Sequence, residues 1–300
     1  MITLLSTWTF GLALALVALG VFVSYRLFSF PDITTDGSFT LGAVATAVLL
    51  TAGVDPLLAT LGGMAAGGLA GCATAVLHAQ FGIERLLAGI LVTTALASVN
   101  LVLLGRSNVP LTGVRTLLDR AEAVLGPPLE RAGLAPAVAG ETARLVLMLL
   151  IVALAIATLW IFFRTQLGTA MRAGGDTPTM ARALGRDTGG MTLAGLAIAN
   201  SLTALAGSLV AQYQGFTDVQ MGIGMVVWGM ASVFLGAALV GPAGLGGALT
   251  AAVAGSVSFR LLVAAALRAG LDPDWLKAAT ALVVLAALVA PRLLARRRHA

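Results

Sequence analysis

The sequence is dominated by long stretches that contain no Asp, Glu, Lys or Arg. A transmembrane helix needs about 20 mostly apolar residues, and the following stretches reach or approach that length: residues 7–25, 37–54, 56–83, 86–105, 145–163, 188–217 and 219–259, with a shorter one at 278–291. Gly241-Pro242 predicts a turn inside the longest stretch. The pattern predicts an all-α fold, a polytopic membrane bundle of about 8–10 transmembrane helices.

Composition argues against the other broad classes of protein. Of the 300 residues, 59% are hydrophobic and 10% are charged, against roughly 25% charged residues in soluble domains. A single cysteine, Cys72, and the two histidines, His78 and His299, are too few for a disulfide framework and make a metal site unexpected. The net charge of +5 comes largely from arginines in 292–298, which are typical of a cytoplasmic membrane anchor rather than a nucleic-acid patch. The first apolar stretch lacks a basic start, so we expect it to be retained rather than cleaved.

Arginines near short loops predict the orientation, because cytoplasmic loops of membrane proteins are enriched in Lys and Arg. Residues 164–190 and 292–298 are the two basic regions, and an even number of apolar segments separates them. Both regions are therefore expected on the cytoplasmic side, together with Arg26 and Arg85. The same count places the amino terminus and the loop 105–143 outside.

The outer loop 105–143 carries balanced charges, and Pro127-Pro128 predicts a break within it. Such a loop is consistent with a surface that faces a partner. A merely tolerated, unstructured connection is an equally open interpretation.

Small residues recur at Gly63, Gly67 and Gly71. This spacing makes a smooth stripe on a helix, along which another backbone can approach closely. We expect the neighbour to be another helix of the same chain, with a subunit interface as the alternative.

Two short segments share the form Phe-x-Asp-aliphatic-polar, at 30–34 and at 216–220. Each precedes a glycine-containing apolar run. Transporters are often built from two pseudo-repeated halves with interrupted helices in corresponding places. A match of so few positions leaves coincidence open as well.

The inner region 164–190 predicts a short helix. Thr177 is suited to cap it, Pro178 to form its first turn and Gly185 to end it, while Met180 and Leu184 share one face. The helix could bind in the groove of a partner protein or lie on lipid headgroups.

Several motifs of the chain resemble one family of membrane proteins. They are Thr165-Gln-Leu-Gly168, Met171-Arg-Ala-Gly174, Ala181-Arg-Ala-Leu-Gly185 and 211–224, with 30–43 in the first half. These segments are similar to permeases of the branched-chain amino acid and ribose importer family, and within it to the branch that accompanies tryptophan- or tyrosine-type binding proteins. The chain departs from that branch at 237–241, where an acidic residue is usual.

The resemblance implies that residues 1–300 form a single transmembrane permease domain in a bacterial inner membrane, with a cytoplasmic carboxyl terminus. It implies an importer of a small organic solute, with amino acids as the expected substrates, delivered by a periplasmic or lipid-anchored substrate-binding protein. Region 164–190 would engage the ATPase subunits, which would hold ATP and Mg. Two nucleotide sites require two coupling loops, so we expect a homodimer of permeases. The residues expected to contact the ATPase are Arg172, Asp176, Thr177, Pro178, Met180, Ala181, Arg182, Leu184 and Gly185.

The chain itself is not expected to be an enzyme. A phosphate-binding Walker loop needs Gly-Lys followed by Ser or Thr, whereas the only lysine, Lys277, follows Leu276. ATP hydrolysis is therefore expected on a separate subunit, and no cofactor is expected on this chain.

Polar residues within or beside the apolar stretches are candidates for the translocation pathway, because such residues usually face a bundle interior or a wet cavity. They are Asp32, Asp36, Asn100, Asn200, Gln212, Gln214, Asp218 and Gln220. The amides could instead join neighbouring helices, and the carboxylates could cap helices. An ion-coupled secondary transporter, with Asp32, Asp36 or Asp218 as the coupling carboxylate, is the alternative function.

Overall fold

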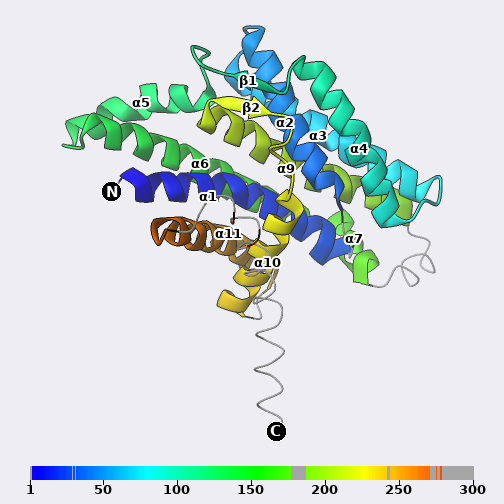
Figure 1. Ribbon diagram of the computed structural model, residues 1–300. Coiled ribbons are helices and arrows are strands. Elements are labelled where there is room, and N and C mark those ends of the chain that lie inside the picture. The colour runs from blue at the N-terminus through cyan, green and yellow to red at the C-terminus, as the bar shows by residue number, and fades with distance from the viewer. Residues whose placement is uncertain are drawn as a thin grey trace.

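The computed structural model describes residues 2–28, 30, 32–176, 187–241 and 244–270, together with residues 275 and 278. The regular structure of this part is helical except for one two-stranded ribbon (Figure 1). In chain order the elements are α1 (Ile2–Val21), η1 (Phe22–Leu27), α2 (Thr34–Thr51), α3 (Pro56–Ala79), α4 (Arg85–Leu104), β1 (Asn108–Pro110), α5 (Leu117–Arg131), α6 (Pro136–Phe162), α7 (Gln166–Asp176), α9 (Thr188–Gln214), β2 (Phe216–Asp218), α10 (Met225–Val240) and α11 (Leu245–Arg268). The expected all-α class is confirmed.

Six of the described helices are long and apolar enough to cross a membrane: α1 with its π-helical continuation η1, α3, α4, α6, α9 and α11. The chain is therefore a multi-pass membrane protein. Helices α2 and α10 are shorter, with 18 and 16 residues. Because α3, α4 and α9 pack around α2, most of its residues are buried. The apolar stretch 278–291 lies outside the described residues, apart from Ala278.

Helix α2 runs parallel to α9 in the middle of the bundle. Its beginning lies beside Asn200, which donates a hydrogen bond to Asp32. Farther along, Ser208 donates to the Gly42 carbonyl at 3.0 Å. The contacts advance in the same direction along both helices, so the two helices point the same way.

Helix α3 runs antiparallel to α9, and the glycine stripe forms the seam between them. A Cβ atom at Gly63 would meet Ser208, whereas one at Gly71 would overlap the carbonyl oxygen of Leu196. A Cβ atom at Gly67 would overlap the carbonyl oxygen of Asn200, which lies between Leu196 and Ser208 along α9. The expectation that the stripe receives a helix of the same chain is thus confirmed.

Helix α10 repeats the relation of α2 to α9, but against α1. A side chain at Gly229 would collide with Val21, and the ring of Phe234 packs edge-on against Tyr25, with 5.9 Å between ring centroids. Residue numbers rise together along the two helices. Helix α10 is therefore parallel to α1 as it continues into η1.

Helix α11 likewise repeats α3, because it runs antiparallel to α1. Gly11 lies against Val257, and near the other end Arg268 donates to the Thr3 hydroxyl at 2.6 Å. In Figure 1, α1 lies between α6 and α11, in agreement with the contacts of these helices.

Helices α2 and α3 pack on α9, and α10 and α11 pack on α1. The two helices that receive these pairs, α1 and α9, are antiparallel to each other. Phe10 of α1 packs on Tyr213 near the end of α9, with ring centroids 6.1 Å apart, while Gly20 lies against Ala199 in the middle of α9. The set α1, α2, α3 is thus related to α9, α10, α11 with inverted direction. The expected two pseudo-repeated halves are present, and each half supplies the helix on which the other half packs.

The two sequence segments that suggested a repeat also share local geometry. The Asp32 carboxylate accepts a hydrogen bond from the Thr34 amide at 2.9 Å, and the Asp218 carboxylate accepts one from the Gln220 amide at 2.7 Å. In each case the side chain bonds the backbone two residues ahead, a common turn of aspartate.

Loop 105–143, predicted from the sequence to be the outer loop, contains an amphipathic helix, α5, which packs on α6. It begins with a capping box in which Thr116 and Asp119 bond each other's backbone amides at 3.1 and 2.9 Å. The expected break at Pro127-Pro128 is wrong, since α5 continues through both prolines. Both prolines are exposed near the end of the helix, as are Ala123 and Val124, so the carbonyl groups that lose their helical donors are open to water. The chain turns instead at Gly133, with φ of 95°.

Further contacts tie loop 105–143 to the bundle. Strand β1 pairs antiparallel with β2, with Asn108 opposite Asp218. The guanidinium of Arg120 bonds Asp55, the cap of α3, at 2.5 Å and holds the pKa of that carboxyl below its ordinary value. Because both side chains are exposed to solvent, this ion pair contributes little stability.

Candidate functional site

Asp32 and Asn200 form a buried polar contact in the centre of the bundle. The Asn200 amide donates to the Asp32 carboxylate at 2.6 Å, and the two residues are 0% and 3% exposed, respectively. Two residues beyond Asp32, the hydroxyl group of Thr34 lies 2.6 Å from that of Thr74. These contacts join α2, α3 and α9 at one level of the bundle.

We expect Asn200→Ala to destabilise the protein by about 1–3 kcal/mol, because the buried Asp32 carboxylate would lose a hydrogen-bond donor. Asn100→Ala is the matched control. Asn100 is also buried in a spanning helix, but its single contact, with the Gly37 carbonyl, is long at 3.5 Å. Thermal unfolding of the detergent-purified variants should show the larger loss for Asn200→Ala, and equal losses would contradict the assignment.

Asp36, in the first turn of α2, binds the amino-terminal end of α10. Its carboxylate accepts hydrogen bonds from the Gly224 amide at 3.0 Å and from the Val226 amide at 2.8 Å. A Cβ atom at Gly222 would overlap the Asp36 carbonyl, so only glycine permits this approach. A carboxylate at a helix amino terminus is favoured by the helix dipole. Asp36 therefore caps a helix, but a helix of the opposite half.

Gln212 and Asn100 also lie at contacts between elements. The Gln212 side chain donates to the Thr60 hydroxyl at 2.9 Å and accepts from the Leu117 amide at 2.8 Å. It thus connects α9 with α3 and with the outer helix α5. Both residues are buried, and these contacts are of the kind that joins helices.

Gln214, Asp218 and Gln220 line one cavity of about 320 Å³ beside the carboxyl-terminal end of α9. The other lining residues are mainly apolar: Phe10, Leu14, Phe39, Val210, Phe216, Met221 and Met225. This outer cavity lies where α1, α2, α9, β2 and α10 meet. Of the sequence-predicted pathway residues, these are the ones that the fold brings together around an open space.

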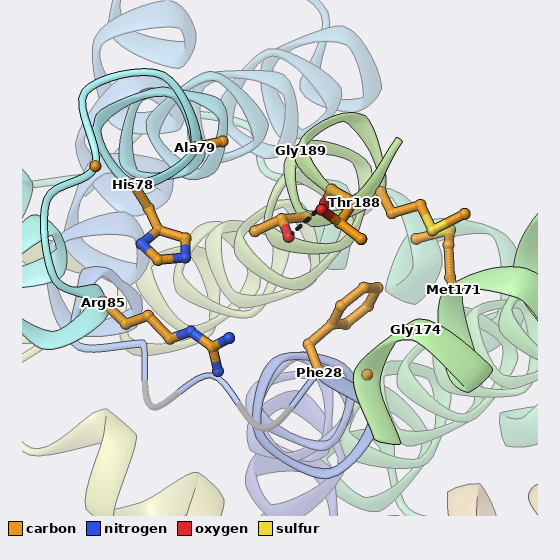
Figure 2. Close-up of a pocket in the computed structure, with 12 residues that line it drawn as sticks. Phe28, His78, Ala79, Arg85, Met171, Gly174, Thr188 and Gly189 are labelled. Atoms are coloured by element: carbon orange, nitrogen blue, oxygen red, sulfur yellow. Dashed lines mark hydrogen bonds between the residues drawn. The ribbon is translucent and has the colours of Figure 1, made fainter. Parts of the chain in front are cut away.

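A second cavity, of about 330 Å³, lies at the opposite end of the bundle (Figure 2). Figure 2 shows His78 and Arg85 on one side of it, Met171 on the other and Phe28 between them. His78 is fixed by a 2.8 Å hydrogen bond between its Nδ1 and the Ile83 carbonyl. This inner cavity is bordered by helix α7 and by the start of α9.

Helix α7 begins the region that was expected to contact an ATPase. Arg172 is exposed on α7, and Asp176 is the last residue of that helix. Thr177, Pro178, Met180, Ala181, Arg182, Leu184 and Gly185 lie outside the described residues. A methyl group at Gly175 would overlap the Leu27 carbonyl. Helix α7 is therefore pressed against the end of η1, and through it against α1.

Comparisons with known proteins agree with this architecture. Residues 3–289 match the family described as the branched-chain amino acid transport system, permease component. The chain belongs to this permease family. It is 37% identical over 285 residues to a tyrosine transport system permease protein of Clostridioides difficile, covering 95% of this chain and 90% of that protein. An uncharacterised protein of Rickettsia prowazekii is 32% identical over 218 residues, covering 73% of this chain and 71% of that one. No solved structure matches.

Sequence reasoning missed one buried group of this permease. Glu141 was counted among the charges of the outer loop, but it lies in the second turn of α6 and is 8% exposed. It accepts hydrogen bonds from the Thr9 hydroxyl at 2.9 Å and the Tyr213 hydroxyl at 2.8 Å. Arg144 lies near it and also bonds Glu122 of α5 at 2.7 Å. The three-residue spacing of Glu141 and Arg144 would place them on one face of a helix, but it does not predict that Glu141 is buried.

Proposed function

We propose that the chain is the membrane-spanning subunit of an ATP-driven importer of amino acids, with tyrosine or a related aromatic amino acid as substrate. The observation that carries the proposal is the likeness to a tyrosine transport system permease over nearly the whole chain. An importer of this kind contains ATPase subunits and an exterior substrate-binding protein. The sequence supports a separate ATPase, because its only lysine does not belong to a Walker loop.

The arrangement of the helices fits this role. Helix α7 forms the first part of region 164–190, the proposed coupling loop, and touches η1, so that a movement of the loop would be passed to α1. The inner cavity borders the same helix. In this proposal, the inner end faces the cytoplasm of the bacterial inner membrane, the carboxyl terminus lies on that side, and loop 105–143 is periplasmic.

The translocation pathway is proposed to pass the outer cavity, with Gln214, Asp218 and Gln220 along it. Asp32, Asn100, Asn200 and Gln212 would then hold the helices that surround the pathway, and Asp36 would hold the two halves together. Nothing favours the ion-coupled alternative, since Asp32 and Asp36 are both engaged by protein donors.

Reconstitution tests the proposal. The chain, co-purified with the ATPase of the proposed importer, should take up an aromatic amino acid into proteoliposomes only when ATP and the binding protein are supplied. Native mass measurement of the purified complex should find two copies of this chain and two of the ATPase. Uptake driven by an ion gradient without ATP would refute the proposal, and a complex with one copy beside a different permease would refute the homodimer.

A further inference from the structure

The outer cavity combines a firm apolar wall with a single charged group. Phe39 is 0% exposed and forms part of the wall, while Phe216 is 38% exposed. Met221 and Met225 complete this side; methionine side chains adapt readily to the shape of a ligand. The volume of about 320 Å³ is at the small end of the range of ligand cavities, about 300–1,000 Å³.

Neighbouring groups hold the ring of Phe10 in place. The Arg260 guanidinium lies over the ring, 4.3 Å from its centroid, and Tyr213 meets the ring edge-on at 6.1 Å. A cation over an aromatic face is attractive, more so away from water. This part of the wall is therefore formed before any ligand arrives, which lowers the entropic cost of binding.

Asp218 supplies the charge at the cavity. Its Oδ1 atom accepts the hydrogen bond from the Gln220 amide, which fixes the carboxylate at the end of strand β2. A carboxylate has several acceptor positions, so it retains capacity for an additional donor. The amide side chains of Gln214 and Gln220 are exposed at the same cavity.

We propose that this outer cavity is a transient binding site for the transported solute, and that it selects amino acids with an aromatic side chain. The aromatic ring would pack against Phe10 and Phe216, since aromatic pairs gain about 0.5–1.5 kcal/mol beyond the burial of their area. The α-ammonium group would bind Asp218. A sugar would leave its hydroxyl groups without partners along the apolar wall, at a cost. This inference rests on the proposed function and adds a selective site in the permease itself.

The test is protection of a reporter cysteine in the complex of the permease with its ATPase. Cys72 is the only cysteine, so Cys72→Ser gives a parent chain to which Gln220→Cys is added, at the exposed edge of the cavity. The complex, in nanodiscs without binding protein, is alkylated with a maleimide in the presence of L-phenylalanine, L-tyrosine or D-ribose. We expect the aromatic amino acids to slow alkylation several-fold and D-ribose to leave it unchanged. Gln214→Cys is the second reporter if the first variant does not fold.

Asp218→Asn tests the charge alone, because asparagine retains the oxygen that accepts the Gln220 amide. The matched control is Asp119→Asn, which removes another outer carboxylate while keeping its acceptor for the Thr116 amide. Protection should disappear in the first variant and persist in the second. Equal protection by D-ribose, no protection by aromatic amino acids, or protection that survives Asp218→Asn would each overturn the site.

Failure of the proposed function gives a different result. The Cys72→Ser parent is assayed for ATP-dependent uptake together with the binding protein. If it imports aromatic amino acids while the reporter shows no protection, only the cavity site is wrong. If it imports another solute but no amino acid, the proposed function is wrong, and the proposed binding site is wrong as well.

Discussion

Replacing Met180 and Leu184 together by Asp is expected to abolish both co-purification of the ATPase and ATP-dependent uptake, while normal amounts of the permease remain in the membrane. The sequence between Thr177 and Gly185 predicts a helix that is too short to be stable alone, because isolated helices below about 12–15 residues are marginal in water. In the proposed importer, the surface of the ATPase would stabilise it. Charges placed on its apolar face would be desolvated in that groove without a partner.

The effect should be specific to the inner side. A matched control introduces two aspartates at Ala123 and Val124, exposed positions on the outer helix α5. This variant should retain the ATPase in affinity purification. If the Met180→Asp, Leu184→Asp variant also retains it, the loop is not the docking element, and the ion-coupled transporter has to be reconsidered.

Gly71→Leu is expected to remove most of the folded protein. A side chain at this position meets the Leu196 carbonyl and the backbone of α9, which cannot rotate away as a side chain can. Adding methylene groups to a packed core costs about 1–3 kcal/mol, and a backbone obstacle raises that cost. The yield of monodisperse protein, followed by size-exclusion chromatography, is the measurement.

Gly62→Leu, in the same helix, is the control. The only atom that a Cβ at Gly62 would meet closely is the end of the Leu49 side chain, which can move to another rotamer. Its yield should stay near that of the unmodified protein, and Gly71→Ala should fall between the two leucine variants. Equal yields for both leucine variants would show that the seam between α3 and α9 tolerates separation.

The sequence predicts well those features that depend on local patterns. Uncharged stretches located the spanning helices, Gly241-Pro242 located the turn between α10 and α11, and the spacing of Gly63, Gly67 and Gly71 indicated a close helix contact. Each follows from a few neighbouring residues and from what lipid requires of a backbone. The prediction at Pro127-Pro128 failed because both prolines lie on the exposed side near the end of α5, where the carbonyl groups left without helical donors are open to water.

The contacts of the candidate site could not be predicted, because they join residues that are far apart in the chain. Asp32 and Asn200 are both polar residues within or beside the apolar stretches, but nothing in the sequence indicates that they contact each other. Helix capping is one of the roles that the sequence offers for Asp36. The helix that Asp36 caps, however, lies far along the chain, because Val226, whose amide donates a hydrogen bond to it, comes 190 residues later. The grouping of Gln214, Asp218 and Gln220 with Phe10 and Phe39 likewise requires the fold.

The interlocked halves have a consequence for how the protein is made. The glycine face of α3 has its partner in α9, which the ribosome produces only after residues 80–187 have been synthesised. In the same way, the surface of α1 that packs on α11 has no partner until α11 has been synthesised. During translation, helices of the first half thus enter the bilayer with their closest packing surfaces still facing lipid. Folding of the bundle is therefore expected to follow insertion of the second half, and a chain truncated before α9 should be a substrate for membrane proteases.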